Sequence, residues 1–178
     1  MKILSLTAAP VFGPRDFLKV AAFGLFLVIV EGFLAAWLGL IGYGPEWMLV
    51  LTIYVALRSE LWVTVLAAFL LGFFRDALGG FMLGLWPLTL IMVAWLFHPS
   101  RLRLNFFHPL TLMPLIFMLS LGGYLLIMTP VMTILGWPGS GFNPLPAFLV
   151  SSLVTALTAP PLFSFMDWLT NNKDLPDG

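Results

Sequence analysis

The chain contains no cysteine and few charged residues, and both shortages limit what it can be. Without cysteine it has no disulfide framework, no cysteine metal site and no thiol chemistry. Charged residues make up 9% of the 178 residues, whereas a soluble domain carries roughly 25%. The formal net charge is zero, so we expect no long-range attraction to nucleic acid.

Apolar residues, by contrast, make up 61% of the chain. Apolar runs of about 20 residues recur, which is long enough for a helix to cross ~30 Å of hydrocarbon. Only helices and closed barrels satisfy their backbone hydrogen bonds in lipid, and the alternating pattern of a barrel is missing. The sequence therefore predicts an all-α, polytopic membrane helix bundle. We expect one integral membrane domain over residues 1–178, with a short cytoplasmic segment at 1–16 and a cytoplasmic tail at 170–178.

We predict about six membrane-spanning helices, and the basic residues predict their orientation. Basic residues favour the cytoplasm when they lie in short loops near span ends. An N-terminus inside the cell places the C-terminus inside as well, together with every basic residue except Arg75. The expected spans are 17–41, 47–57, a third that starts at Leu61, 81–97, 110–135 and 145–169. The basic residues on the cytoplasmic side are Lys2, Arg15, Lys19, Arg58, Arg101, Arg103 and Lys173.

Two opposite charges lie inside the predicted spans. At 1.5 Å per helical residue, Arg75 lies roughly 21 Å beyond Leu61, in the outer third of the bilayer. Glu31 occupies the same position relative to Phe17 in the first span. A charge facing lipid costs about 2.5–3.5 kcal/mol or more near the bilayer centre, so such residues turn inward and pair. We predict an intramembrane ion pair between Glu31 and Arg75, which Asp76 could join. Such a pair either fixes the register of the two helices or takes part directly in binding a partner.

Small residues recur every four positions around Asp76, at Gly72, Gly80 and Gly84. On a continuous helix these residues would share one face and let another helix approach closely. One helix through the whole apolar region would be too long for a single crossing. We therefore expect the chain to break at Gly79 and Gly80, where glycine tolerates a turn. Asp76 would then cap free N–H groups of the helix that follows.

The segment "GFFRDALGGFMLGLWPL", residues 72–88, resembles the signature of the MreD family of rod-shape-determining membrane proteins. Gly72, Asp76, Gly80 and Gly84 match the family pattern, and "TIYVALRSELWVTVLAAFLLG" just upstream is similar in layout. Two residues depart from it. Arg75 stands where the family usually has an apolar residue, and Trp86 stands where histidine is common.

This resemblance implies a non-catalytic scaffold in the bacterial inner membrane, within the machinery that elongates the lateral cell wall. The implied partners are a bitopic MreC-type protein, the actin-like MreB filament, the RodA glycosyltransferase and its class B penicillin-binding transpeptidase. The scaffold would help to couple the filament to the synthases.

The residues themselves show no catalytic constellation, and we expect neither an enzyme nor a bound metal or cofactor. His98 and His108 have no nearby carboxylate. Arg101 and Arg103 lie in the loop "HPSRLRLNFFHP", which is either an ordinary positive-inside loop or a contact for anionic lipid or a cytoplasmic partner.

A substrate-binding subunit of an energy-coupling-factor vitamin importer is the alternative, since such subunits have a similar size. Trp86 is our candidate for a pocket or partner contact, and Glu31, Arg75 and Asn143 could line the same pocket.

Overall fold

The computed structural model describes residues 13–38, 44–79, 83–97, 109–125, 133 and 144–170, and it contains no strand in these ranges. The all-α prediction is therefore confirmed for this part of the chain. The helices are α1 (Pro14–Leu38), α2 (Trp47–Arg58), α3 (Leu61–Gly79), α4 (Leu85–Phe97), α5 (Pro109–Gly123) and α7 (Pro144–Leu169).

Helix boundaries follow the sequence closely. The predicted spans at 47–57 and 145–169 match α2 and α7 within one residue at each end. At the start of α1, the side chain of Asp16 accepts a hydrogen bond of 3.1 Å from the backbone N–H of Gly13. Helix α1 then begins with Pro14, whose missing N–H costs nothing in the first turn of a helix. Helix α4 begins at Leu85 rather than 81, because the chain turns immediately before it.

Two of the described helices are long and apolar enough to cross a membrane. These stretches are Leu61–Leu78 in α3 and Leu145–Leu169 in α7. Three shorter apolar helices accompany them, at Trp47–Arg58, Leu85–Phe97 and Leu112–Gly123. The count of six spans thus stays a prediction.

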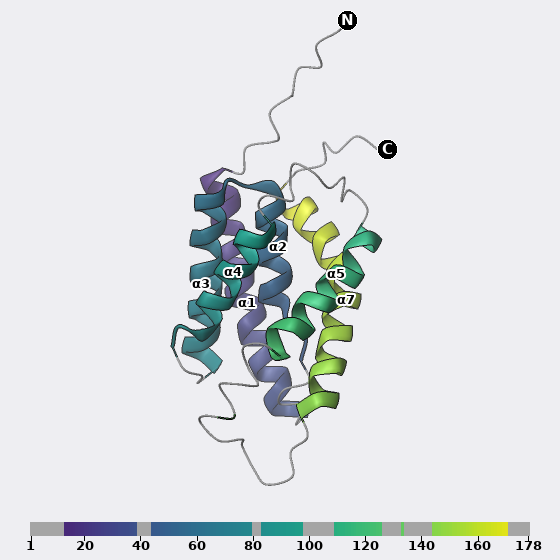
Figure 1. The fold of residues 1–178 in the computed structure, drawn as a ribbon. Helices are drawn as coiled ribbons and strands as arrows, with labels where there is room; N and C mark the ends of the chain where they lie inside the picture. The colour runs from purple at the N-terminus through teal and green to yellow at the C-terminus, as the bar shows by residue number, and fades with distance from the viewer. Residues whose placement is uncertain are drawn as a thin grey trace, which may run out of the picture.

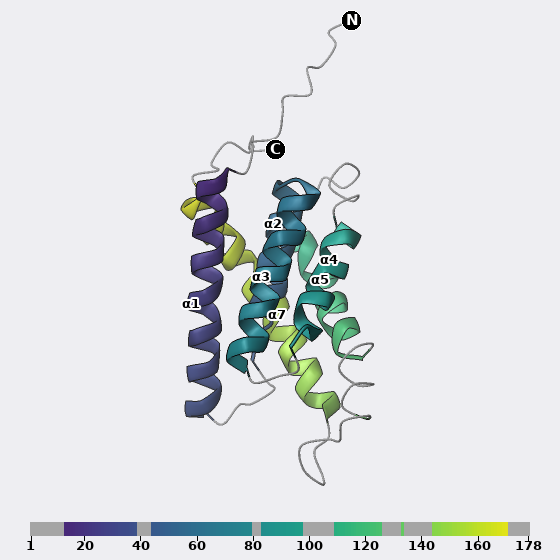
Figure 2. The ribbon, with the colours of Figure 1, turned by 90° about the vertical axis from the view of Figure 1, so that its left-hand side faces the viewer.

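Helix α2 forms the centre of the bundle. It contacts α1, α3, α4 and α7, and its side chains from Met48 to Ala56 are all buried. Helix α1 lies at one edge and α4 and α5 lie at the opposite edge (Figure 2). Helix α4 packs mostly against α3, and α5 packs mostly against α7 (Figure 1). An apolar helix that is buried all round needs no polar face, which explains why α2 carries so few polar residues.

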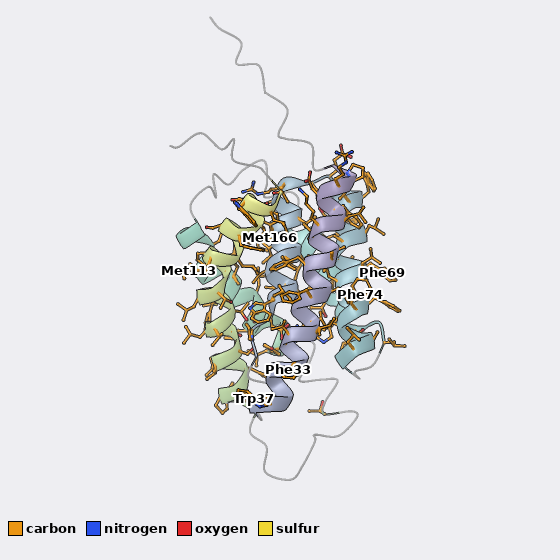
Figure 3. All side chains as sticks on the ribbon, turned by 180° about the vertical axis from the view of Figure 1, so that it is seen from behind. Phe33, Trp37, Phe69, Phe74, Met113 and Met166 are labelled. Carbon is orange, nitrogen blue, oxygen red and sulfur yellow. The ribbon has the colours of Figure 1, made fainter. Side chains whose placement is uncertain are left out.

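Large apolar side chains also cover the outside of the bundle. Phe33 and Trp37 on α1 and Phe69 on α3 are 68%, 76% and 47% exposed, and Figure 3 shows them on the outer faces of their helices. Soluble monomers rarely expose contiguous apolar patches larger than a few hundred Å². A surface of this kind is compatible with a location in lipid.

A polar contact layer joins three helix ends at one end of the bundle. Lys19 near the start of α1 donates a hydrogen bond of 2.9 Å to the carbonyl oxygen of Leu169 at the end of α7. Arg58 at the end of α2 forms an ion pair of 2.8 Å with Asp167. Tyr54 donates a hydrogen bond of 2.9 Å to the same carboxylate. The start of α1 and the ends of α2 and α7 therefore lie at the same end of the bundle (Figure 1).

Candidate functional site

A cluster of polar side chains surrounds Arg75 inside the otherwise apolar bundle. Its members come from α1, from the residue before α2, from α3 and α4, from the residue after α5, and from α7. We call it the Arg75 cluster, and it consists of Glu31, Glu46, Arg75, Trp86, Tyr124 and Ser151.

The predicted ion pair between Glu31 and Arg75 is present. Nη2 of Arg75 lies 3.1 Å from Oε1 of Glu31, and the two side chains are 11% and 18% exposed. The equal depth that the sequence predicts for the two residues thus corresponds to a contact between α1 and α3. Pairing offsets part of the cost of removing both charges from water.

Glu46 is a second carboxylate on the same guanidinium, and the sequence reasoning did not find it. Nη1 of Arg75 lies 2.7 Å from Oε2 of Glu46, and Nη2 donates a hydrogen bond of 2.9 Å to Oε1. In this two-point contact, the Nη2 contact is a hydrogen bond and the Nη1 contact is an ion pair. The backbone N–H of Glu46 donates a hydrogen bond of 2.8 Å to Oγ1 of Thr155 on α7. One signal was available, since "GYGPE", residues 42–46 between the first two predicted spans, places an acidic residue directly before an apolar helix.

Trp86 covers Arg75 from the side of α4. The guanidinium carbon lies 3.9 Å from the centre of the indole ring, within the range of a cation–π contact. The tryptophan is buried, and its ring contacts a residue of this chain, so its role in a pocket or partner contact stays a prediction. Arg75 and Trp86 are the two residues that depart from the MreD pattern, and they contact each other.

Tyr124 and Ser151 connect the cluster to α5 and α7. The hydroxyl of Tyr124 donates a hydrogen bond to Oε1 of Glu46, and its oxygen lies 2.9 Å from Oγ of Ser151. Ser151 in turn donates a hydrogen bond to the carbonyl oxygen of Gly44. The ring of Tyr124 stacks on Phe148 of α7, with the ring centres 4.5 Å apart. Glu46 is thereby held by groups from α3, α5 and α7.

Asp76 contacts the turn between α3 and α4, one residue before the helix whose N–H groups the sequence predicts it to cap. Its Oδ2 accepts a hydrogen bond of 2.7 Å from the backbone N–H of Gly84, the residue before α4. The ion pairs that the structure describes for Arg75 are with Glu31 and Glu46, so Asp76 does not join them there. The carboxylate of Asp76 therefore lies beside the start of α4, where a negative charge is favourable.

The glycines divide into a packing position and turn positions. A Cβ atom added to Gly72 would lie 2.4 Å from the backbone nitrogen of Pro87, so α3 and α4 approach each other closely here. Helix α3 ends at Gly79, where we expected the break. Gly84 has a φ of 103°, and an added Cβ would meet nothing within 4 Å among the described residues, so of the two expected roles, packing and turn, it has the turn role. It is a turn residue because α3 has already ended. Gly80 lies outside the described residues.

Other candidates from the sequence also lie outside the described residues. They are His98, Arg101, Arg103, His108 and Asn143. Within the described ranges no group of three or more histidine or carboxylate side chains converges on a common point as a metal site would require.

A small cavity adjoins the Arg75 cluster between α2, α4 and α5. Its volume is about 10 Å³, close to the minimum that a single water molecule needs. Its lining comprises Glu46, Leu49, Trp86, Thr89, Ser120, Gly123 and Tyr124.

The geometry of the Arg75 cluster suits a structural junction. The guanidinium of Arg75 lies between two carboxylates and an indole ring, and these contacts join α1, α3, α4 and the start of α2. No family model, curated protein or solved structure matches the chain.

Proposed function

We propose that the chain is a polytopic protein of the bacterial inner membrane and a non-catalytic scaffold of the wall-elongation machinery, as its resemblance to the MreD family implies. In this proposal it binds an MreC-type bitopic protein and helps to couple the MreB filament to RodA and its class B penicillin-binding transpeptidase. Anionic membrane lipids would contact the loop that contains Arg101 and Arg103.

The segment 72–88 is the observation that carries the proposal. Its matching residues have definite structural roles in a helix–turn–helix unit. Gly72 permits the close approach of α4, and Asp76 accepts the N–H of Gly84 before α4 begins. The roles of Gly72 and Asp76 depend on their residue types, and this dependence supports a shared architecture.

The membrane assignment draws on the apolar outer surface and on the polar contact layer at one end. Lys19 and Arg58 belong to that layer, which agrees with the cytoplasmic side that the basic residues predict. The Arg75 cluster lies beyond the opposite end of α2, at the outer side in this topology. Six spans and two cytoplasmic termini remain part of the proposal.

The cavity size favours a scaffold over a vitamin-binding subunit. Pockets for small molecules commonly have volumes of roughly 300–1,000 Å³. Among the described residues, the cavity beside Trp86 measures about 10 Å³, and Arg75 covers one face of the indole ring.

Co-purification of the tagged protein from its native membrane in mild detergent, followed by quantitative mass spectrometry, tests the proposal. We expect an MreC-type protein and wall synthases to be recovered. Recovery of ATPases with a coupling membrane subunit would contradict the scaffold and support the importer.

A pair of variants tests whether the outer turn matters for this complex. Asp76→Ala removes the acceptor for Gly84 and should reduce partner recovery at equal expression. Asp16→Ala removes a carboxylate that caps the start of α1 at the opposite end of the bundle, and it should leave recovery unchanged. Equal recovery with both variants would show that the turn before α4 takes no part in binding.

A further inference from the structure

The cavity beside the Arg75 cluster brings together two buried polar atoms that have neither a hydrogen-bond partner nor an ion-pair partner among the described residues. These are Nε1 of Trp86 on α4 and Oγ of Ser120 on α5. Both residues line the cavity and are 6% and 2% exposed. Buried polar groups are nearly always hydrogen-bonded, because an unpaired one has lost its contact with water and gained nothing in return. Two such atoms around one cavity indicate a ligand that serves both.

The chemistry of the lining defines the class of that ligand. The indole N–H is only a donor, so the ligand must accept a hydrogen bond, and a bare metal cation or an ammonium group cannot. Glu46 lines the same cavity, and its negative charge disfavours an anion. A volume of about 10 Å³ admits one non-hydrogen atom. A neutral group that both donates and accepts, and that has the size of one oxygen atom, meets all three conditions.

We propose that this cavity is a binding site for a single hydroxyl-sized ligand, held between Trp86 and Ser120. The ligand accepts a hydrogen bond from the indole N–H and exchanges one with the serine hydroxyl. Its source is either a water molecule or the free hydroxyl of a lipid headgroup, which share this chemistry.

The position of the site gives the ligand a structural consequence. Helix α4 packs mainly on α3, and α5 packs mainly on α7, so the site lies between two helix pairs. Trp86 also covers Arg75, whereas Ser120 lies one turn before Tyr124, which contacts Glu46. A ligand bound to both Trp86 and Ser120 connects the two sides of the Arg75 cluster and holds α4 to α5.

Nuclear magnetic resonance of the full chain, with 15N-labelled tryptophan in lipid nanodiscs, tests this site. The indole signal of Trp86 is assigned by its loss in Trp86→Phe. In phosphatidylcholine, which has no free hydroxyl, we expect magnetisation transfer between this indole proton and water. In phosphatidylglycerol, transfer to headgroup protons instead of water identifies the lipid hydroxyl as the ligand, and continued transfer to water identifies water.

Filling the cavity is the decisive variant. Ser120→Val should abolish the transfer in both lipids, because the added methyl groups occupy the site. Ser152→Val is the matched control, since Ser152 is also a fully buried serine with an unpartnered hydroxyl but does not line the cavity. It should preserve the transfer.

Two results would overturn the proposal. One is the lack of any transfer to the Trp86 indole proton in both lipids. The other is transfer that persists unchanged in Ser120→Val. If Ser120→Val does not fold, Ser120→Ala replaces it and should shift the Trp86 indole resonance while Ser152→Ala does not. An unshifted resonance in Ser120→Ala would equally exclude the site.

Discussion

Arg75 lies closer to Glu46 than to Glu31, at 2.7 Å against 3.1 Å between the nearest nitrogen and oxygen atoms. Glu46 is also the more buried carboxylate, with a side chain that is 2% exposed against 18% for Glu31. The stronger attachment of α3 is therefore to the start of α2, and through Tyr124 and Thr155 to α5 and α7. The pair that is evident from the sequence is the weaker of the two.

This ranking predicts unequal effects of removing the two charges. Glu46→Gln should destabilise the protein by about 3–5 kcal/mol, the range for breaking a buried ion pair by changing one partner. Glu31→Gln should cost less, because Glu31 is partly exposed and Arg75 keeps its two-point contact with Glu46. Thermal unfolding in detergent, followed by size-exclusion chromatography, measures the difference. Glu60→Gln is the control, since Glu60 is exposed. Equal losses for Glu31 and Glu46 would contradict the ranking.

Arg75→Lys tests whether the shape of the guanidinium matters as well as its charge. Lysine keeps the positive charge but cannot form the two-point contact with Glu46 or stack its plane on Trp86. We expect a loss of about 1–3 kcal/mol in unfolding free energy, by analogy with charged hydrogen bonds. Arg58→Lys is a useful comparison, because Arg58 forms its ion pair with Asp167 at the more exposed end. Wild-type stability in Arg75→Lys would show that charge alone is needed.

Gly72→Ala should separate α3 from α4. The new Cβ would lie 2.4 Å and 2.5 Å from the backbone nitrogen and Cα of Pro87, and backbone atoms cannot move aside as a flexible side chain can. Overpacking of this kind typically costs about 1–3 kcal/mol. Gly32→Ala on α1 has no heavy atom within 4 Å among the described residues, and it should be neutral or stabilising. Unfolding temperatures of the two variants, measured side by side, give the test. A neutral Gly72→Ala would mean that the two helices do not approach this closely.

The absence of native cysteine makes the topology directly measurable with single-cysteine variants. Glu60 lies between α2 and α3, and Leu83 lies between α3 and α4, and both are exposed. We expect Glu60→Cys to react with a membrane-impermeant maleimide only after the cell is opened. Leu83→Cys should react in cells whose outer membrane has been permeabilised and whose inner membrane is intact. Reaction of both cysteines from the same side would contradict a membrane crossing by α3.

Local features of this protein were readable from the sequence because they depend on neighbouring residues. Apolar runs and their polar interruptions placed α2 and α7, and Gly79 with the glycine after it placed the end of α3. The sequence also placed Asp76 near the next helix, and its Oδ2 accepts a hydrogen bond from Gly84 directly before that helix. Prediction of the contact between Glu31 and Arg75 required one further inference, namely that opposite charges at equal depth in two helices lie close together.

The rest was decided by how helices pack in three dimensions. Glu46 lies 29 residues from Arg75 and 78 residues from Tyr124 in the sequence, and it forms hydrogen bonds with both. No periodicity relates positions at such separations, so the second carboxylate and the tyrosine could not be assigned to Arg75. Trp86 appeared as an isolated departure from a family pattern until the structure placed it over Arg75. The sequence by itself therefore determined the apolar character of this protein and the positions of its helices. Tertiary packing alone determined which polar groups meet in its interior, because a buried charge needs partners and these come from helices that are distant in the sequence.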